Sequence, residues 1–321
     1  MPSPVITPVF PLLDALASSR KQKVFLVGGA LRDAHLGRSG RDLDFAVSSD
    51  AIALARRFAK AIKGAFVLLD KESGCARVAK KRAGRLWTYD FADLRAKTLK
   101  GDLLRRDFTI NTLAVDIKEL VDCGDTYEIK QRFRTCPRKY YMIKENKYYA
   151  HPKALSDLKA GIIRMAGPGA FRDDPLRLLR AYSLQAQLGF RIERSTLARI
   201  KAERGLIKQV SVERVREELF KILASPRAAA VIKAMDRDGM LFEIMPQVRV
   251  MYGVKQGGYH HLDVWEHSLE VLVQLEKLLE ETSSHQGLNA YLGEGLGGGH
   301  SRVAVLKLAC LWHDIGKPDT K

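Results

Sequence analysis

The sequence predicts an α+β protein in which a small mixed α/β part is followed by an all-helical part. Two observations lead to this prediction. In residues 1–120 short apolar runs alternate with a helical segment, and from Asp173 onward apolar residues recur every three to four positions. With 321 residues, 46% of them hydrophobic, the chain can fold into two or three domains with a sizeable core.

The N-terminal part contains runs with the length and composition of β-strands. They are Val24–Val27, Leu43–Val47, Ala65–Leu69 and Leu86–Phe91. Ala51–Ile62 has the periodicity of an amphipathic helix. Gly28 and Gly29 end the first run. Glycines between a strand and a helix allow backbone N–H groups to approach a phosphate, and Arg32 adds a cation there.

The second predicted strand places two carboxylates on one face. Because side chains alternate along a strand, Asp42 and Asp44 point one way, while Leu43 and Phe45 point into the core. Two such acids can hold Mg²⁺ ions roughly 3.5–4 Å apart, which stabilises both oxygens of an in-line displacement. The alternative is a surface turn with two solvated acids, but the combination of the glycine turn with the two acids favours nucleotidyl transfer. Asp90, on a later strand, is either a third carboxylate of this site or an edge-strand acid facing water.

The C-terminal part is predicted to be helical from Asp173. Val212–Leu223 has helical spacing, and Gly189 and Pro226 interrupt the pattern. Asp174 and Arg177 fall at positions i and i+3 of the first of these helices, so a carboxylate and a guanidinium group can meet a base edge side by side. An ordinary ion pair within the helix is the alternative.

Charge and cysteine usage limit the class of protein. The chain carries 54 Lys and Arg against 37 Asp and Glu, a net charge of +17, which favours a nucleic acid partner over a merely basic protein. The four cysteines have no metal-ligand or disulfide spacing, which suggests a reducing cytoplasm. No leader and no apolar run of about 20 residues is visible, so we expect neither secretion nor a membrane span.

Residues 126–150 are basic and aromatic. Their seven cations are interleaved with six aromatic residues, the combination that single-stranded or loop RNA contacts use. An added β-hairpin with a solvated basic face is the alternative.

The two motifs of the N-terminal part resemble those of a known family. Gly28-Gly29-x-x-Arg32-Asp33 followed by Asp42-x-Asp44 is similar to the first signature of class II tRNA nucleotidyltransferases and bacterial poly(A) polymerases. Two later stretches match in order: residues 105–114 resemble the ribose-binding segment, and residues 173–181 resemble the base-recognition helix, with Asp173 in place of the usual glutamate. The resemblance runs from about Val24 to Pro318.

The resemblance implies a fold and a division of the chain. It implies a polymerase-beta-like nucleotidyltransferase head at 1–165, with the basic aromatic insertion at about 125–153. An all-α neck for base recognition and RNA binding would follow at 166–235, and a partial all-α HD domain at 236–321.

The resemblance also implies roles for site residues. Asp42 and Asp44 would ligate the metals, with Asp90 as a further catalytic candidate. The guanidinium group of Arg106 can donate two parallel hydrogen bonds, Asp107 supplies an acceptor and Asn111 supplies an amide, which together suit a ribose and its phosphates. An ion pair that fixes Arg106 near Asp107 is the alternative. The implied nucleotide-binding set is Gly28, Gly29, Arg32, Arg106, Asp107, Asn111, Asp174, Arg177 and Arg180.

A second motif lies near the end of the chain. His267, His313 and Asp314 match the first ligands of HD-type phosphohydrolases, which suit Mn²⁺ or Ni²⁺. The final aspartate of that family would lie beyond Lys321. We therefore expect the HD domain to be cut short and its metal site to be incomplete.

The expected activity is template-independent addition of C, A or both from CTP and ATP to the tRNA 3′ end, with Mg²⁺. The segment between Arg95 and Asp102 is shorter than the flexible loop of many CCA-adding relatives, which resembles enzymes that add only CC or only A. Poly(A) polymerase is the first alternative. An HD phosphohydrolase and a non-catalytic RNA-binding protein are further ones, and the sequence leaves the oligomeric state open.

Overall fold

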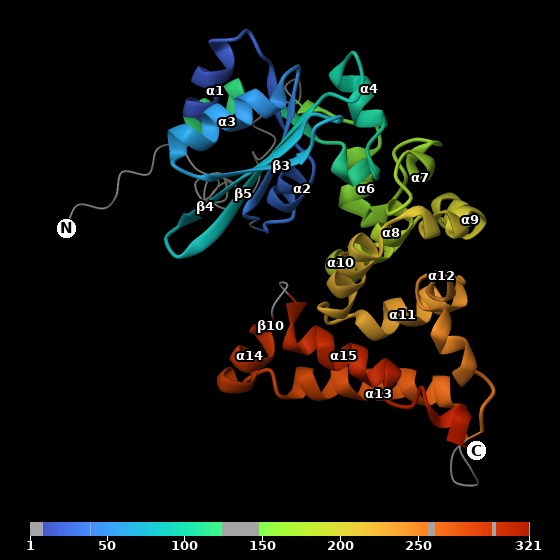
Figure 1. Ribbon diagram of the computed structural model, residues 1–321. Helices are drawn as coiled ribbons and strands as arrows, with labels where there is room; N and C mark the ends of the chain where they lie inside the picture. Colours follow the sequence, from blue (N-terminus) through green and yellow to red (C-terminus); the bar gives the residue numbers. More distant parts are fainter. Residues whose placement is uncertain (1–8, 39, 124–147, 256–260, 297–299, 321) are drawn as a thin grey trace. The chain divides into compact units, whose positions relative to one another are not determined.

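The computed structural model describes residues 9–38, 40–123, 148–255, 261–296 and 300–320 (Figure 1). The chain divides into two compact units. The first, called the head here, comprises residues 1–160 and 164–168, and the second, called the helical unit, comprises residues 161–163 and 169–321. This α+β arrangement confirms the predicted fold class.

The head is built on a seven-stranded mixed sheet. In spatial order its strands are β3 (Ala65–Asp70), β4 (Cys75–Arg82), β5 (Arg85–Asp93), β2 (Asp42–Val47), β1 (Val24–Val27), β6 (Ala114–Asp116) and β7 (Tyr148–Tyr149). β2 and β5 run parallel, and the other neighbours are antiparallel. All four predicted strands are present within one or two residues. Most of the predicted insertion at 126–150 lies outside the described residues.

One face of the sheet is closed by α1 (Val9–Ser18) and α3 (Ala51–Ile62), which lie on the same side of it (Figure 1). The ring of Phe58 on α3 lies 5.5 Å from that of Phe91, and Phe91 stacks on Phe45 at 5.1 Å. Leu43 and Phe45 are 3% and 1% exposed, so the predicted inward direction of these two side chains is confirmed.

Of the described residues, those of α4 (Leu99–Leu104) cover part of the opposite face. Leu99 and Leu103 of α4 pack with Phe25, Val27 and Ala46 of β1 and β2. Strand alternation puts Asp42 and Asp44 on this same face, beyond the contact with α4. The head therefore has one closed face and one face on which polar side chains can meet a ligand.

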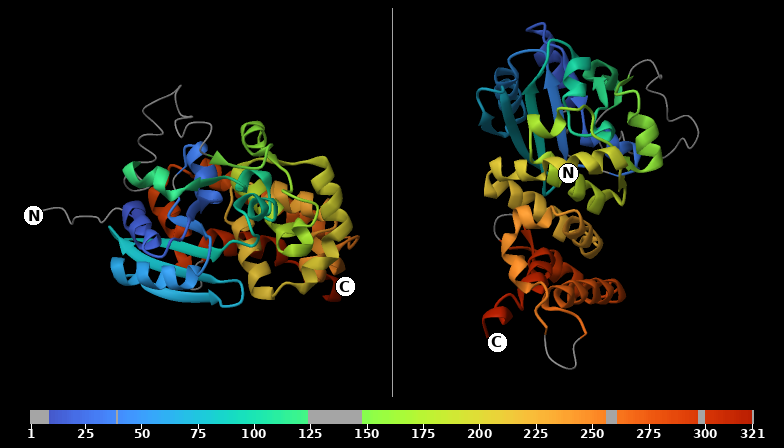
Figure 2. Two further views of the ribbon diagram at one scale, coloured as in Figure 1. Left: turned by 90° about the horizontal axis from the view of Figure 1, so that it is seen from above. Right: turned by 90° about the vertical axis from the view of Figure 1, so that its right-hand side faces the viewer.

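The described part of the helical unit consists of helices of 4 to 18 residues and two small ladders, β8–β9 (Ile162–Ile163, Arg191–Ile192) and β10–β11 (Gly295–Leu296, His300–Ser301). The helices are α7 (Ala170–Asp173), α8 (Arg177–Leu188), α9 (Arg194–Glu203), α10 (Val212–Leu223), α11 (Ala228–Arg237), α12 (Leu241–Ile244), α13 (Val264–Glu281), α14 (Gln286–Gly293) and α15 (Arg302–Trp312). α13 and α15 pack side by side (Figure 2). Among the helices described, none has the length and apolar character of a membrane span.

The prediction that Asp174 and Arg177 lie at positions i and i+3 of one helix is wrong. α7 ends at Asp173, Asp174 is extended with φ −155° and ψ 100°, and α8 begins only at Arg177. The cause is Pro175, because its ring disfavours the helical conformation of the residue before it. Asp174 thus lies in the turn before α8 and Arg177 is the first residue of α8, so the two do not share a helix face.

Candidate active site

Three carboxylates gather on the open face of the head sheet. Asp42 and Asp44 lie on β2, and Asp90 lies on β5 directly across from Asp44 in the parallel register. Thr88, across from Asp42, donates its hydroxyl hydrogen to the Asp42 carboxylate. Asp42 is exposed, while Asp44 and Asp90 are half-buried. The structure therefore brings together the three acids that the sequence singled out.

An arginine that the sequence analysis did not identify completes this row. Arg77 of β4 lies across from Asp90, and its Nε and Nη2 donate to Oδ1 and Oδ2 of Asp90, each at 2.7 Å. The hydrogen bond to Asp90 raises the pKa of Arg77 despite partial desolvation, and the charges of Asp90, Asp42 and Asp44 act in the same direction. Arg77 thus places a permanent positive charge within the field of all three acids.

Gly28 brings the backbone close to these acids. It precedes α2 (Gly29–His35) with φ +75°, a conformation that L-residues rarely adopt. A Cβ atom at Gly28 would lie 3.5 Å from Nη1 of Arg106 and 3.5 Å from Oδ2 of Asp44. The glycine turn, Arg106 of the 105–114 stretch and Asp44 of the first signature therefore meet at one point.

Arg32, Asn111 and Asp107 form a buried hydrogen-bonded chain. Nη1 of Arg32 donates to Oδ1 of Asn111 at 2.7 Å, and Nδ2 of Asn111 donates to both Asp107 oxygens at 3.1 and 3.2 Å. Arg32 also donates from Nε to Asp33 at 2.9 Å. The three residues are 8%, 4% and 8% exposed, so much of their polar capacity is used within the protein.

Arg106 forms its ion pair with Asp102. Nε and Nη2 of Arg106 lie 3.1 and 3.0 Å from Oδ2 of this buried acid, which precedes it by four residues. The alternative of an arginine fixed by an ion pair is therefore observed, with Asp102 as the partner. The sequence analysis did not identify Asp102 as a site residue.

The candidates for base recognition lie in the helical unit. Asp174 pairs with Arg214 of α10, with Nη2 at 3.1 Å from each carboxylate oxygen. Arg177 is 4% exposed and donates from Nη1 to the carbonyl oxygen of Ala170 at 3.0 Å. Arg180 is exposed. The sequence analysis missed Arg214, because it lies 40 residues beyond Asp174.

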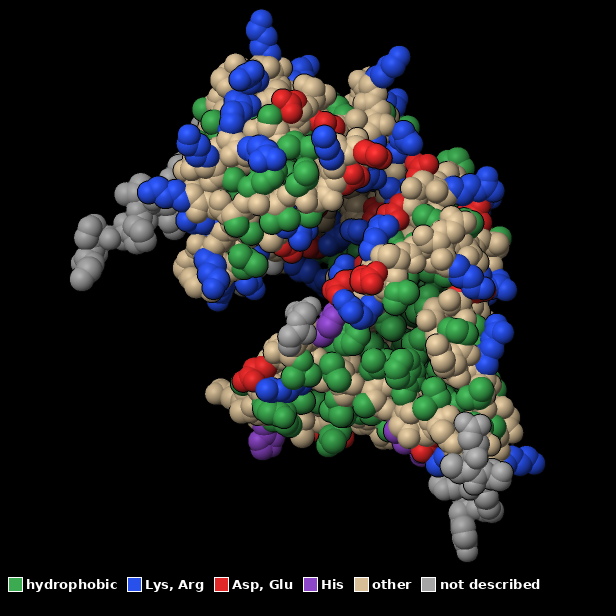
Figure 3. Space-filling model, in the orientation of Figure 1, with side chains coloured by type: hydrophobic (Ala, Val, Ile, Leu, Met, Phe, Trp, Pro, Cys, Tyr) green, Lys and Arg blue, Asp and Glu red, His purple; other side chains and the backbone are tan. Residues whose placement is uncertain are grey.

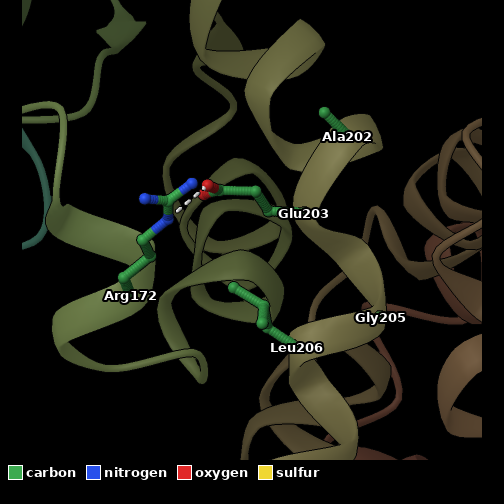
Figure 4. A pocket seen from close by; sticks show the side chains of 5 residues that line it. All are labelled: Arg172, Ala202, Glu203, Gly205 and Leu206. Carbon is green, nitrogen blue, oxygen red and sulfur yellow. Dashed lines mark hydrogen bonds and ion pairs between the residues drawn. The ribbon is translucent and has the colours of Figure 1, made fainter.

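A shallow pocket of about 280 Å³ in the helical unit contains none of the predicted site residues (Figure 4). It is lined by Arg172, Ala202, Glu203, Gly205 and Leu206. Arg172 and Arg199 both pair with the Glu203 carboxylate, at 3.0 and 2.9 Å. A carboxylate held between two arginines is a structural tie between α7 and α9, so the pocket is not our candidate for the chemistry.

The predicted HD ligands lie close together in the helical unit. His267 lies on α13, His313 and Asp314 follow α15, and one ligand atom of each falls within 4.8 Å of the others. Nε2 of His313 and of His267 lie 3.1 and 3.8 Å from Oδ2 of Asp314. Nζ of Lys317 lies 2.6 Å from the same oxygen. Two imidazoles and a carboxylate suit a transition metal, but a lysine already pairs with the carboxylate.

Basic side chains are spread over both units on the face shown in Figure 3, in keeping with the net charge of +17. The positive charge is therefore not confined to the surroundings of Asp42, Asp44 and Asp90 or to one helix.

Two family models match this chain. Residues 24–133 match the "Poly A polymerase head domain", and residues 189–251 match the "Probable RNA and SrmB- binding site of polymerase A". The first match contains the acids of β2 and β5, Gly28 and Arg106.

Curated relatives match over most of the chain. The A-adding tRNA nucleotidyltransferase of Deinococcus radiodurans is 33% identical over 303 residues, which is 92% of this chain and 57% of the relative. The CC-adding tRNA nucleotidyltransferase of Geobacter sulfurreducens is 35% identical over 236 residues, which is 74% of this chain and 48% of the relative. The chain thus spans about half the length of these relatives.

A solved structure shares the fold. It is a tRNA nucleotidyltransferase complexed with a primer tRNA and an incoming ATP analogue, with a TM-score of 0.66 and 26% identity. The match covers 94% of this chain and 75% of that chain.

Proposed function

Because this chain belongs to the family of class II tRNA nucleotidyltransferases and bacterial poly(A) polymerases, we propose that it adds nucleotides from CTP, ATP or both to the 3′ end of tRNA. The observation that carries the proposal is the row of Asp42, Asp44 and Asp90 on adjacent strands, next to the backbone of Gly28. In the reaction, the terminal 3′-oxygen forms a bond to the α-phosphorus and pyrophosphate leaves.

Asp42 and Asp44 fit Mg²⁺, because carboxylate oxygens are the ligands that this ion prefers. When bound, Mg²⁺ stabilises charge on the transferring phosphoryl group and lowers the pKa of a bound hydroxyl. Asp90 can accept the proton of the attacking hydroxyl with a lone pair that Arg77 does not use. The metal identity and these roles are our proposals.

The remaining head residues would bind the nucleotide. Gly28 leaves room for the triphosphate, and Arg106 donates to it from Nη1. Arg32, Asn111 and Asp107 hold one another and thereby keep the Gly28–Arg32 turn fixed beside the ribose segment. In the helical unit, Asp174, Arg177 and Arg180 are our candidates for reading the base.

We infer that only part of CCA is added. The segment from Arg95 to Asp102 is short, and it is held by a hydrogen bond from the Arg95 amide to Asp102 at 3.0 Å. The two curated relatives above carry the names A-adding and CC-adding, which supports the same inference.

Cys75 and Cys310 are free thiols, so we propose the cytoplasm as the location.

The test is incubation of the full chain with labelled CTP or ATP and tRNA transcripts that end before C, after CC and after CCA. With CTP and ATP both present, extension of the first transcript only to CC, or of the second transcript but not the first, supports partial addition, whereas extension of the first transcript through to CCA identifies an enzyme that adds all of CCA. Extension past CCA by a run of A identifies a poly(A) polymerase. No extension of any transcript contradicts the proposal and favours an RNA-binding protein.

The cluster of His267, His313 and Asp314 favours a second candidate activity, metal-dependent phosphohydrolysis. Lys317 competes for the Asp314 carboxylate, which weighs against it. Release of phosphate from nucleotides that requires His313, and not Asp42, would support this second activity.

A further inference from the structure

Asp102 is an acid buried beside the proposed nucleotide site. It lies on α4, is 2% exposed, and both of its oxygens accept hydrogen bonds. Oδ2 accepts from Nε and Nη2 of Arg106 at 3.1 and 3.0 Å, and Oδ1 accepts from the backbone amide of Arg95 at 3.0 Å. Aspartate is rarely buried to this extent unless it is paired, and here the partners are Arg106 of the 105–114 stretch and the Arg95 amide that precedes α4.

This pairing determines where the rest of the guanidinium group points. The group is planar, so once Nε and Nη2 are fixed on one oxygen, the direction of Nη1 is fixed as well. Nη1 lies 3.5 Å from the position that a Cβ of Gly28 would occupy, and Oδ2 of Asp44 lies at the same distance from that position. Nη1 therefore points to the place where backbone, acid and phosphate would meet.

The helix that carries Asp102 is itself fixed on the sheet. The Thr98 side chain caps α4 by accepting from the Gly101 amide at 3.1 Å. Leu99 and Leu103 then pack with Phe25, Val27 and Ala46, on the face that carries Asp44. Packing of α4 thus sets the position of Asp102, and Asp102 sets the position of Arg106.

We propose that Asp102 is a positioning residue that aims Nη1 of Arg106 at the triphosphate of the incoming nucleotide. The inference rests on the proposed function. Asp102 neutralises Arg106 in part, so its contribution is orientation rather than added attraction for phosphate. Loss of Asp102 should therefore weaken nucleotide binding, even though it leaves the site more positive.

Asp102→Asn is the informative variant. An amide offers one acceptor and one donor group, so it cannot accept from both Arg106 and the Arg95 amide. With CTP and ATP varied at saturating tRNA, we expect KM for the nucleotide to rise about tenfold and kcat to change much less, as for an interaction made equally in ground and transition states. The Kd for tRNA should stay at the parent value.

A double-mutant cycle separates positioning from general destabilisation. If Asp102 acts through Arg106, Asp102→Asn combined with Arg106→Gln should have the nucleotide KM of Arg106→Gln alone. Asp102→Glu, which keeps the charge but shifts the carboxylate, should raise the nucleotide KM as Asp102→Asn does. Melting temperatures verify that each variant is folded.

Glu218→Gln is the matched control. Glu218 is a buried acid of the helical unit, paired with Lys221 at 2.7 Å, so its loss should lower the melting temperature and leave the nucleotide KM unchanged. An unchanged nucleotide KM in Asp102→Asn, or additive effects in the double variant, would overturn the inference. If the parent chain itself extends no transcript, it is the proposed function that fails.

Discussion

The head and the helical unit each gather side chains that can ligate a metal ion, and they do so by different means. In the head, Asp42, Asp44 and Asp90 come from two adjacent strands whose register fixes their separation. In the helical unit, His267 comes from α13, whereas His313 and Asp314 follow α15, so helix packing determines their approach. The head offers oxygen ligands suited to Mg²⁺, and the helical unit offers mainly imidazole nitrogen, suited to transition metals.

A cation lies beside each cluster, and the two cations differ in the carboxylate with which they pair. Arg77 pairs with Asp90, the acid across the sheet from Asp44. Lys317 pairs with Oδ2 of Asp314, the oxygen that both histidines approach. A cation on the shared ligand atom competes with a metal ion directly, whereas a cation on a neighbouring acid mainly orients that acid. For this reason we propose that nucleotide addition takes place in the head.

The largest effect should come from the acids of β2. We expect Asp42→Asn or Asp44→Asn to reduce nucleotide addition at least roughly 100-fold, the scale seen when one transition-state contact is removed. Binding of tRNA should persist, because basic surface determines affinity. Single-turnover extension and filter binding measure the two quantities. His313→Ala is the matched control, and a loss in His313→Ala equal to that in Asp44→Asn would reverse the comparison.

The next effect concerns the two cations. Lys317→Met should tighten Ni²⁺ binding at the histidine cluster by roughly tenfold, because it removes a charge from the ligand atom itself. Arg77→Met should tighten Mn²⁺ binding at the head by less, because the hydrogen bonds of Arg77 go to Asp90, a neighbour of the proposed ligands Asp42 and Asp44. Calorimetric titration of each variant, with Arg77→Lys as control, gives both affinities. Equal changes in metal affinity at the two sites would show that the two cations compete equally with a metal ion.

The sequence analysis located β1, β2, β3 and β5 because their apolar runs are long enough to identify, but it did not predict β6 and β7. β4 was missed, since Cys75–Arg82 ends in Lys80, Lys81 and Arg82, and its short apolar part alternates with a polar residue only through Ala76, Arg77 and Val78. That alternation of period two was the available signal. Missing β4 also meant missing Arg77, because nothing else in the sequence places it across from Asp90.

Other parts of the site depend on contacts that the sequence does not contain. Arg32 and Asn111 bond although 79 residues separate them, so no local pattern could show that these predicted ligand residues hold each other. Asp174 was assigned to a helix although Pro175 argued against it, and there the signal was present in the sequence. The division of the helical unit into a neck and an HD domain stays a prediction.

A smaller effect should distinguish Arg177 from Arg214, which both lie in the helical unit. Arg177→Ala should cost about 1–3 kcal/mol of stability, because its guanidinium is buried and bonded to the Ala170 carbonyl. It should also relax nucleotide choice, admitting UTP or GTP. Arg214→Ala should cost less than about 1 kcal/mol, since the pair with Asp174 is exposed. Chemical denaturation measures the stability of both variants, and competition between nucleotides measures their selectivity. Unchanged nucleotide selectivity in Arg177→Ala would exclude Arg177 from base recognition.

The smallest effect on chemistry should come from the insertion at 126–150, most of which lies outside the described residues. Changing Arg132, Arg134, Arg138 and Lys139 to Ala should weaken tRNA binding and reduce the slope of log affinity against log salt by roughly 0.7–0.9 per lost phosphate contact. Tyr140→Ala and Tyr141→Ala should weaken binding at every salt concentration, as lost stacking does. An unchanged affinity and slope in the four-cation variant would identify the insertion as a structural appendage.

Anomalous scattering from Mn²⁺, in crystals of the chain grown with a non-hydrolysable CTP or ATP analogue, tests most directly whether the head site performs the transfer. The account predicts an anomalous peak between the carboxylates of Asp42 and Asp44, with the triphosphate of the analogue beside Gly28 and Nη1 of Arg106. A peak confined to His267, His313 and Asp314, with no nucleotide bound in the head, would contradict it.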